Sequence, residues 1–156
     1  MLKHTQPPPA PAKEGPNQAD IGALLRVNYQ VVRERQLVAL IDEGFADLNE
    51  AFLSVLLCPG LDRLRPSDLA ARTNTTKQAM NYLLGQLEAL GYIERRTAAG
   101  NGRRFVFLTK RGWRARETIQ KAAEDVAAEW VAILGQRRFR QFVETLRQLS
   151  VADKAS

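Results

Sequence analysis

Metal-binding and redox-active residues are almost missing from this sequence. It contains one cysteine, Cys58, and one histidine, His4. A single cysteine cannot form an internal disulfide, and so few ligands nearly exclude a cysteine–histidine zinc cluster. His4 lies in a proline-rich stretch, which is a poor position for the base of a catalytic triad, and there is no phosphate-binding glycine loop. We therefore expect no metal, no cofactor and no enzymatic activity.

Long hydrophobic runs are missing as well. No apolar stretch approaches the roughly 20 residues that a membrane helix needs. The first residues, MLKHTQPPPAPAKEGPNQ, lack the apolar core and the cleavage site of a secretory signal, so we expect a cytoplasmic protein. Residues 1–19 also have too few large apolar side chains to offset the entropy of ordering, which predicts a disordered tail. A second short tail is expected at residues 151–156.

Positive charge is concentrated in one part of the chain. The 156 residues include 23 Lys and Arg against 17 Asp and Glu, a net charge of +6. Residues 62–111 hold ten of the cations and four of the anions, so this segment accounts for the whole net charge. A neutral scaffold with one basic segment is typical of proteins that bind a polyanion. The alternative is a solvated surface with scattered basic residues.

Residues 20–150 are expected to form one domain that begins with two helices. Asp20 can cap a long helix that ends at Gly44. A short helix then starts at Asp47 or Asn49 and stops before the sequence Cys-Pro-Gly. The long helix carries apolar residues at roughly helical spacing, namely Ile21, Leu24, Leu25, Val31, Val32, Val38, Leu40 and Ile41.

A short helix and a turn follow. Pro66 suits the first position of a helix, where its missing N–H costs nothing, and this helix ends near Arg72. Asn74 supplies the turn residue because asparagine tolerates the left-handed conformation. The sequence therefore predicts a short helix and then a tight turn before the next helix.

The next helix runs to Leu90 and is amphipathic. Its N-cap is either Thr75, in a capping box with Gln78, or Thr76. Its apolar stripe is expected to face inward, and consists of Met80, Leu83, Leu84, Leu87 and Leu90.

The polar residues at the start of this helix then face outward. Glutamine and asparagine can pair bidentately with adenine, and lysine can reach guanine or a phosphate. Threonine hydroxyls and a helix N-terminus suit phosphate oxygens. An ordinary polar surface is the alternative. The outward set is Thr76, Lys77, Gln78, Asn81 and Tyr82.

A basic β-hairpin comes next. Residues 92–96 and 103–108 read as strands, and the Asn101-Gly102 pair between them is a strong hairpin signal. Four arginines flank this turn, which fits contact with phosphates or the minor groove; protection of an edge strand by charge is the alternative. They are Arg95, Arg96, Arg103 and Arg104. Thr109 then caps another long helix, and a last helix covers about residues 136–150.

The order short helix, turn, amphipathic helix and hairpin is the plan of a winged helix-turn-helix. We predict a mainly α fold with a small β-hairpin wing. Residues 61–109 form the DNA-binding unit, and residues 20–57 and 110–150 form flanking dimerisation helices. Their apolar residues exceed what so small a domain needs, although a single larger monomeric core is the alternative. A two-fold dimer would match paired half-sites about 34–36 Å apart.

Two motifs resemble those of the MarR family of bacterial regulators. They are Leu87-Glu88-Ala89-Leu90-Gly91-Tyr92-Ile93-Glu94-Arg95-Arg96 and Leu108-Thr109-Lys110-Arg111-Gly112. The resemblance implies a dimer in which two recognition helices read a pseudo-palindromic operator. It places Thr76, Lys77, Gln78 and Asn81 at DNA-contact positions, Arg103 and Arg104 near the wing arginine, and Arg65 near a phosphate. We expect Thr75, next to this group, to contact DNA as well. The family's wing aspartate has no counterpart here.

The resemblance also implies a repressor that a small-molecule effector can release from DNA. Such an effector would lie between the dimer helices and the DNA-binding unit, near Tyr29, Arg33, Phe52 and Trp113. Cys58 is better explained as a buried thiol than as a redox sensor, since no neighbouring cation in the sequence would lower its pKa. A winged-helix adaptor that binds proteins rather than DNA is the competing hypothesis.

Overall fold

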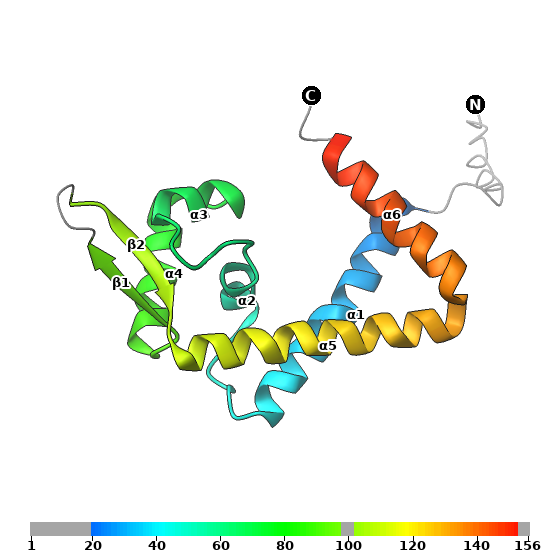
Figure 1. The fold of residues 1–156 in the computed structure, drawn as a ribbon, viewed down its shortest axis with the longest axis horizontal. Helices are drawn as coiled ribbons and strands as arrows, with labels where there is room; N and C mark the ends of the chain where they lie inside the picture. Colours follow the sequence, from blue (N-terminus) through cyan, green and yellow to red (C-terminus); the bar gives the residue numbers. More distant parts are fainter. Residues whose placement is uncertain (1–19, 98–101, 153–156) are drawn as a thin grey trace, which may run out of the picture.

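The computed structural model describes residues 20–97 and 102–152. It contains six helices and a hairpin in these ranges (Figure 1). The expected N-terminal tail and the turn residue Asn101 lie outside the described residues. The elements are α1 (Ile21–Asp42), α2 (Glu50–Leu56), α3 (Pro66–Arg72), α4 (Lys77–Ala89), β1 (Ile93–Thr97), β2 (Arg104–Leu108), α5 (Lys110–Leu134) and α6 (Gln136–Ala152). The last helix thus runs two residues into the segment that we expected to be a tail.

Most helix starts follow the capping signals in the sequence. The carboxylate of Asp20 accepts a hydrogen bond from the Ala23 backbone N–H (3.1 Å), as predicted. Asn49, rather than Asp47, caps α2. The α4 cap is Thr76, whose hydroxyl accepts from the Ala79 N–H at 3.1 Å, so the predicted capping box at Thr75 is wrong. Thr75 instead lies in the turn before the helix.

The core lies beneath α2, α3, α4 and the hairpin. Met80, Leu84 and Leu87 are fully buried, and Leu83 and Leu90 pack against this core, which confirms the inward stripe of α4. The two strands pair antiparallel, with Arg95 opposite Val106 and Thr97 opposite Arg104. Leu64 adds an isolated bridge to Val106 on the other edge of β2. These contacts make one compact unit at one end of the molecule (Figure 1).

A long α5 connects this unit to the other end of the molecule. Helix α1 crosses α5 and packs against it, and the Gln36 side chain donates a buried hydrogen bond to the Ile119 carbonyl (3.3 Å). Arg35 and Glu129 form an ion pair across the same crossing at 3.0 Å. Helix α6 turns back from the end of α5 and packs against it (Figure 1). None of the described helices is long and apolar enough to cross a membrane.

The outer parts of α1 and α6 bury few apolar side chains. In α1, Ile21, Leu24 and Leu25 are each at least half exposed, and Leu40 is the only member of the apolar set predicted from the sequence that is fully buried. Over its described side chains, α6 has no buried residue, and its Leu149 is 63% exposed. Apart from its end near Leu40, the apolar face of α1 therefore does not serve the core of this single chain.

Candidate nucleic-acid interface

The first turns of α4 present a group of polar side chains to solvent. Lys77, Gln78 and Asn81 are all exposed, while Met80 between them is fully buried. This contrast follows from helical geometry, because residues on the face opposite an apolar stripe must point outward. The predicted reading residues are thus brought together at one end of one helix. We call Thr76, Lys77, Gln78, Asn81 and Tyr82 the reading group.

Tyr82 extends the reading group along the exposed side of α4. Its side chain is 67% exposed, and its hydroxyl accepts a hydrogen bond from the Gln86 amide at 3.2 Å. A tyrosine can contact a partner through both its apolar ring and its polar hydroxyl. Tyr82 therefore adds an apolar surface with a polar tip beside the amide-bearing residues.

The turn before α4 is held by hydroxyl groups. Asn74 adopts the positive φ of 51° that the sequence predicts. The Thr73 hydroxyl donates to the Leu69 carbonyl (2.8 Å), and the Thr75 hydroxyl lies within hydrogen-bond distance of the Thr73 carbonyl (3.2 Å). Because these bonds satisfy its hydroxyl locally, Thr75 acts in the turn that orients α4.

The arginines of the hairpin divide between its two faces. Alternation along paired strands places Arg95 and Arg104 on the face of buried Val106. Arg96 lies on the outer face, where its guanidinium stands 4.9 Å from the Phe107 ring centroid and pairs with Glu94. Arg96, Arg103 and Arg104 are exposed. The wing thus offers cationic groups on both sides of a narrow ribbon.

Arg95 is held inside the protein rather than presented to solvent. Its guanidinium donates to the carboxylate of Glu88 in α4, at 2.9 and 2.6 Å, and its side chain is 19% exposed. The hydrogen bond from Arg95 is the main reason that the pKa of Glu88 lies below its ordinary value. The Glu88 carboxylate thus joins α4 to the wing.

Arg65 also has an internal partner. It makes two hydrogen bonds of 2.9 Å to the Asp68 carboxylate in the first turn of α3. The hydrogen bond from Arg65 lowers the pKa of Asp68. This bidentate pair fixes the Arg65 side chain at the start of α3, with 42% of it exposed.

Arg63 is a basic residue that the sequence analysis did not single out. Its side chain is 81% exposed, and its backbone has a positive φ of 73°, which is uncommon for a residue other than glycine. Its N–H donates to the Val106 carbonyl at 2.7 Å, which holds the segment against β2. No sequence pattern marks this position, because the conformation depends on pairing with a distant strand.

The four residues proposed near an effector are only partly brought together. Arg33 is 8% exposed, and it donates to the Tyr29 hydroxyl (2.6 Å) and to the Ser54 hydroxyl (3.2 Å). Its Nη1 atom is buried and makes no hydrogen bond with the described residues. Phe52 is buried in the core, whereas Trp113 is 44% exposed at the start of α5. Tyr29 and Arg33 thus form a pair, and Phe52 serves the core.

Potential metal ligands do not gather anywhere in residues 20–97 and 102–152; no group of three Asp, Glu, His or Cys side chains there could hold a metal ion. Cys58 is buried, and burial raises the pKa of its thiol.

Comparison with known proteins points to one family. Residues 59–104 match the sequence profile of the MarR family. No curated protein sequence matches the chain. The MarR family protein Rv2887 of Mycobacterium tuberculosis, solved in complex with salicylic acid, is 26% identical with a TM-score of 0.62, over 85% of this chain and 98% of that one.

Two solved structures that contain DNA are also similar. Rv2887 in complex with DNA is 26% identical with a TM-score of 0.62, and the match covers 84% of this chain and 98% of that chain. FabT of Streptococcus pneumoniae in complex with DNA is 18% identical with a TM-score of 0.73, and the match covers 86% of this chain and 96% of that chain. The predicted winged helix-turn-helix fold with flanking helices is therefore confirmed.

Proposed function

We propose that this chain, a winged helix-turn-helix protein of the MarR type, is a cytoplasmic transcriptional repressor that binds duplex DNA sequence-specifically as a homodimer. The observation that carries the proposal is the exposed reading group on α4. Lys77, Gln78 and Asn81 face solvent at the start of a helix whose opposite face is fixed in the core. The helix cannot rotate these side chains away without exposing Met80, Leu84 and Leu87.

The chemistry of the reading group suits the major groove, which is about 12 Å wide and admits one helix. The side-chain amide of Gln78 or Asn81 can donate to N7 of adenine and accept from its N6 amino group. Lys77 can donate to guanine. Thr76 places its hydroxyl at the helix N-terminus, where backbone N–H groups favour a phosphate.

The wing supplies the sequence-independent part of the affinity. Arg96, Arg103 and Arg104 are exposed and can neutralise phosphates, which makes binding steeply dependent on salt. Arg65, Thr75 and Arg95 were also expected to contact DNA. Because their polar groups are engaged within the chain, we assign them to orienting the interface.

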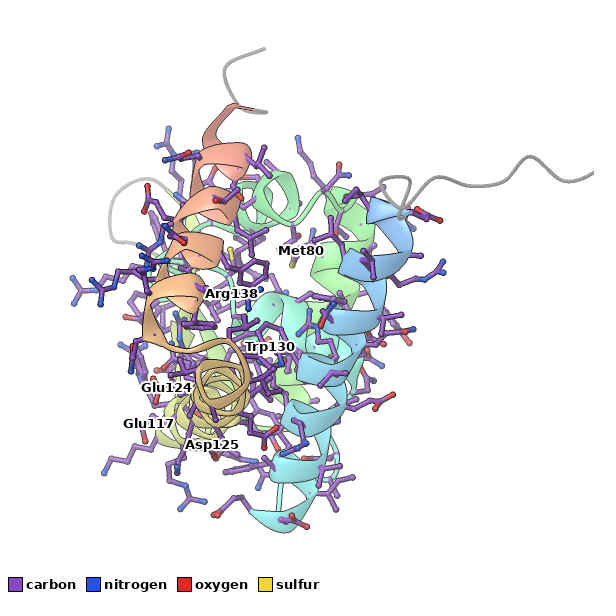
Figure 2. The ribbon with its side chains drawn as sticks, turned by 90° about the vertical axis from the view of Figure 1, so that its right-hand side faces the viewer. Met80, Glu117, Glu124, Asp125, Trp130 and Arg138 are labelled. Atoms are coloured by element: carbon purple, nitrogen blue, oxygen red, sulfur yellow. The ribbon has the colours of Figure 1, made fainter. Side chains whose placement is uncertain are left out.

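The uncovered faces of α1 and α6 support a homodimer. A groove lined by Asn28, Trp130, Ile133, Leu134 and Phe142 lies between α1, α5 and α6. Seen from this end of the molecule, α1 and α6 stand on opposite sides with Trp130 between them (Figure 2). A second copy that packs here would bury apolar side chains that one chain leaves in water. A dimer bound across an operator represses by occluding the duplex.

A small-molecule effector is supported by Arg33. Arg33 is only 8% exposed, and its buried Nη1 group has no hydrogen-bond partner among the described residues, which favours a carboxylate ligand as acceptor. We propose that an aromatic carboxylate binds near Arg33 and Tyr29 and weakens DNA binding. Sodium salicylate should raise the Tm of the wild type but not that of Arg33→Met; equal shifts in both would reject this site.

The test of DNA binding is fluorescence anisotropy with genomic duplex fragments over a range of salt. Wild-type protein should bind a subset of fragments tightly. Lys77→Ala with Arg103→Ala should reduce the slope of log affinity against log salt by about four per dimer, because each of the two subunits loses two cations. The matched control, Lys121→Ala with Arg137→Ala, removes the same charge elsewhere and should leave the slope unchanged. If the wild type binds no fragment even at low salt, the adaptor hypothesis is favoured instead.

A further inference from the structure

One carboxylate joins α4, the reading helix that carries the reading group, to the wing through both of its oxygens. Glu88 Oε2 accepts two hydrogen bonds from the Arg95 guanidinium, and Glu88 Oε1 accepts one from the Arg95 backbone N–H at 2.9 Å. All three bonds therefore link one residue of α4 with one residue of β1. We call this set the Glu88–Arg95 clasp.

The clasp fixes more than the distance between the two elements. A bond to the side chain alone would let the strand slide or twist, but a second bond to the backbone N–H also fixes the direction of the strand. The side chain of Arg95 is mostly buried between the elements. Gly85, one helical turn earlier, lies beside the same guanidinium, since a β-carbon there would make an ordinary 4.0 Å contact with Arg95 Nη2.

The position of the clasp relates it to DNA recognition. The reading group occupies the start of α4, and Glu88 lies near its end, next to the short connection through Leu90 and Gly91 that leads into β1. The bridge from Leu64 to Val106 holds the free edge of β2, whereas the clasp ties β1 directly to α4. Phosphate contacts by the wing and base contacts by α4 can form together only at one relative orientation.

We propose that Glu88 is a positioning residue that sets the orientation of the wing relative to the reading helix, and thereby the discrimination between operator and random DNA. This inference rests on the proposed function. Glu88 would not itself contact DNA, because a carboxylate is repelled by phosphates. Arg104 also lies close enough to lower the pKa of Glu88 through its charge, so the clasp sits within the basic surface of the wing.

The two effects of removing this carboxylate have opposite signs, which makes the role measurable. Glu88→Gln removes one negative charge beside the interface and should therefore tighten binding to any duplex. Loss of the fixed wing angle should weaken binding to the operator alone. A merely structural role would instead reduce both affinities through partial unfolding.

The matched control is Glu94→Gln, which removes the same charge from the outer face of the same hairpin, where Glu94 pairs with Arg96. We expect Glu94→Gln to raise the affinity for the operator and for a scrambled duplex by the same factor. Glu88→Gln should lower the ratio of the two affinities by about tenfold, comparable to the loss of one specific base contact. The same ratio in both variants would overturn the proposal.

A second measurement works without DNA. Spin labels at Ala79→Cys and Thr97→Cys, in a Cys58→Ser background, report the distance between α4 and the wing by double electron–electron resonance. Glu88→Gln should broaden this distance distribution, and Glu94→Gln should not. If the wild type shows no specific DNA binding but Glu88→Gln still broadens the distribution, the clasp stands and the proposed function fails. An unchanged distribution overturns the clasp whatever the DNA result.

Discussion

Gly112 in the first turn of α5 packs directly on the carbonyl oxygen of Tyr92. A β-carbon built at Gly112 would lie 2.0 Å from that oxygen and 2.9 Å from Leu108 Cδ2. The Thr109 hydroxyl, which caps α5, lies 2.6 Å from the Gly91 carbonyl, so it too fastens this turn to the end of α4. The Leu-Thr-x-x-Gly motif therefore joins the reading helix, the wing and α5 at one point.

Gly112→Ala should destabilise the protein by about 2–4 kcal/mol, because the backbone of α5 must move away from Tyr92 to accept the methyl group. Chemical denaturation monitored by circular dichroism measures this. Gly85→Ala is the matched control in another helix. It meets nothing closer than 4.0 Å, so it should be neutral or stabilising by up to about 1 kcal/mol. Equal stability of the two variants would contradict the packing described here.

Alkaline pH should destabilise the protein through Tyr92. Burial raises the pKa of Tyr92 to about 12, and its hydrogen bond to the Asp47 carboxylate adds to the rise while Arg111 opposes it. The unfolded chain releases this proton near its ordinary pKa of about 10. The folded state is therefore favoured fully below about pH 10, and this contribution is lost as the pH rises toward about 12.

Tyr92→Phe removes the ionisable group, so its free energy of unfolding should fall less steeply between pH 9 and pH 11 than that of the wild type. Urea denaturation at several pH values measures the slope. Tyr82→Phe, at an exposed position, is the control and should keep the wild-type slope. A Tyr92→Phe slope equal to that of the wild type would show that the burial of the phenol does not govern alkaline stability.

Association into a dimer should depend on the outer part of α1. Leu25 is 52% exposed in the single chain, and Leu25→Asp would place a carboxylate twice in a two-fold interface. We expect the dimer dissociation constant to rise by about 100-fold or more. Sedimentation equilibrium measures this constant.

The control for the dimer is Ile41→Asp, a substitution at the other end of the same helix, beyond its crossing with α5, where the side chain is 59% exposed. It should associate as the wild type does. A wild-type protein that remains monomeric at about 100 μM, well above the Kd of a stable interface, would instead show that the uncovered apolar faces meet some other partner.

Local signals in the sequence predicted the framework of this fold. Asp20 and Thr109 cap their helices, and the stripe from Met80 to Leu87 faces the core, because each depends on residues only a few positions apart. The choice between Thr75 and Thr76 was not resolved by the sequence, since both satisfy the local rule for a cap. The hydroxyl bonds of the preceding turn decide it.

Contacts between distant residues were beyond sequence reasoning. Arg95 and Arg96 are adjacent arginines, so the sequence does not distinguish their roles. Only the alternation of side chains along the strand, which puts Arg95 on the same face as Val106, directs it toward Glu88. The apolar set of α1 likewise looked like part of a core. A period of 3.6 residues shows that a face is apolar, but it does not show whether the same chain covers that face.

The central claim, that the start of α4 reads base edges, is tested most directly by selecting bound duplexes from a random pool. Wild-type protein should enrich a palindromic motif with half-sites about one helical turn apart. Asn81→Ala should still bind DNA but lose the base preference at one position of each half-site. Enrichment of the same motif by Asn81→Ala, Gln78→Ala and Lys77→Ala, with every preference intact, would contradict the claim.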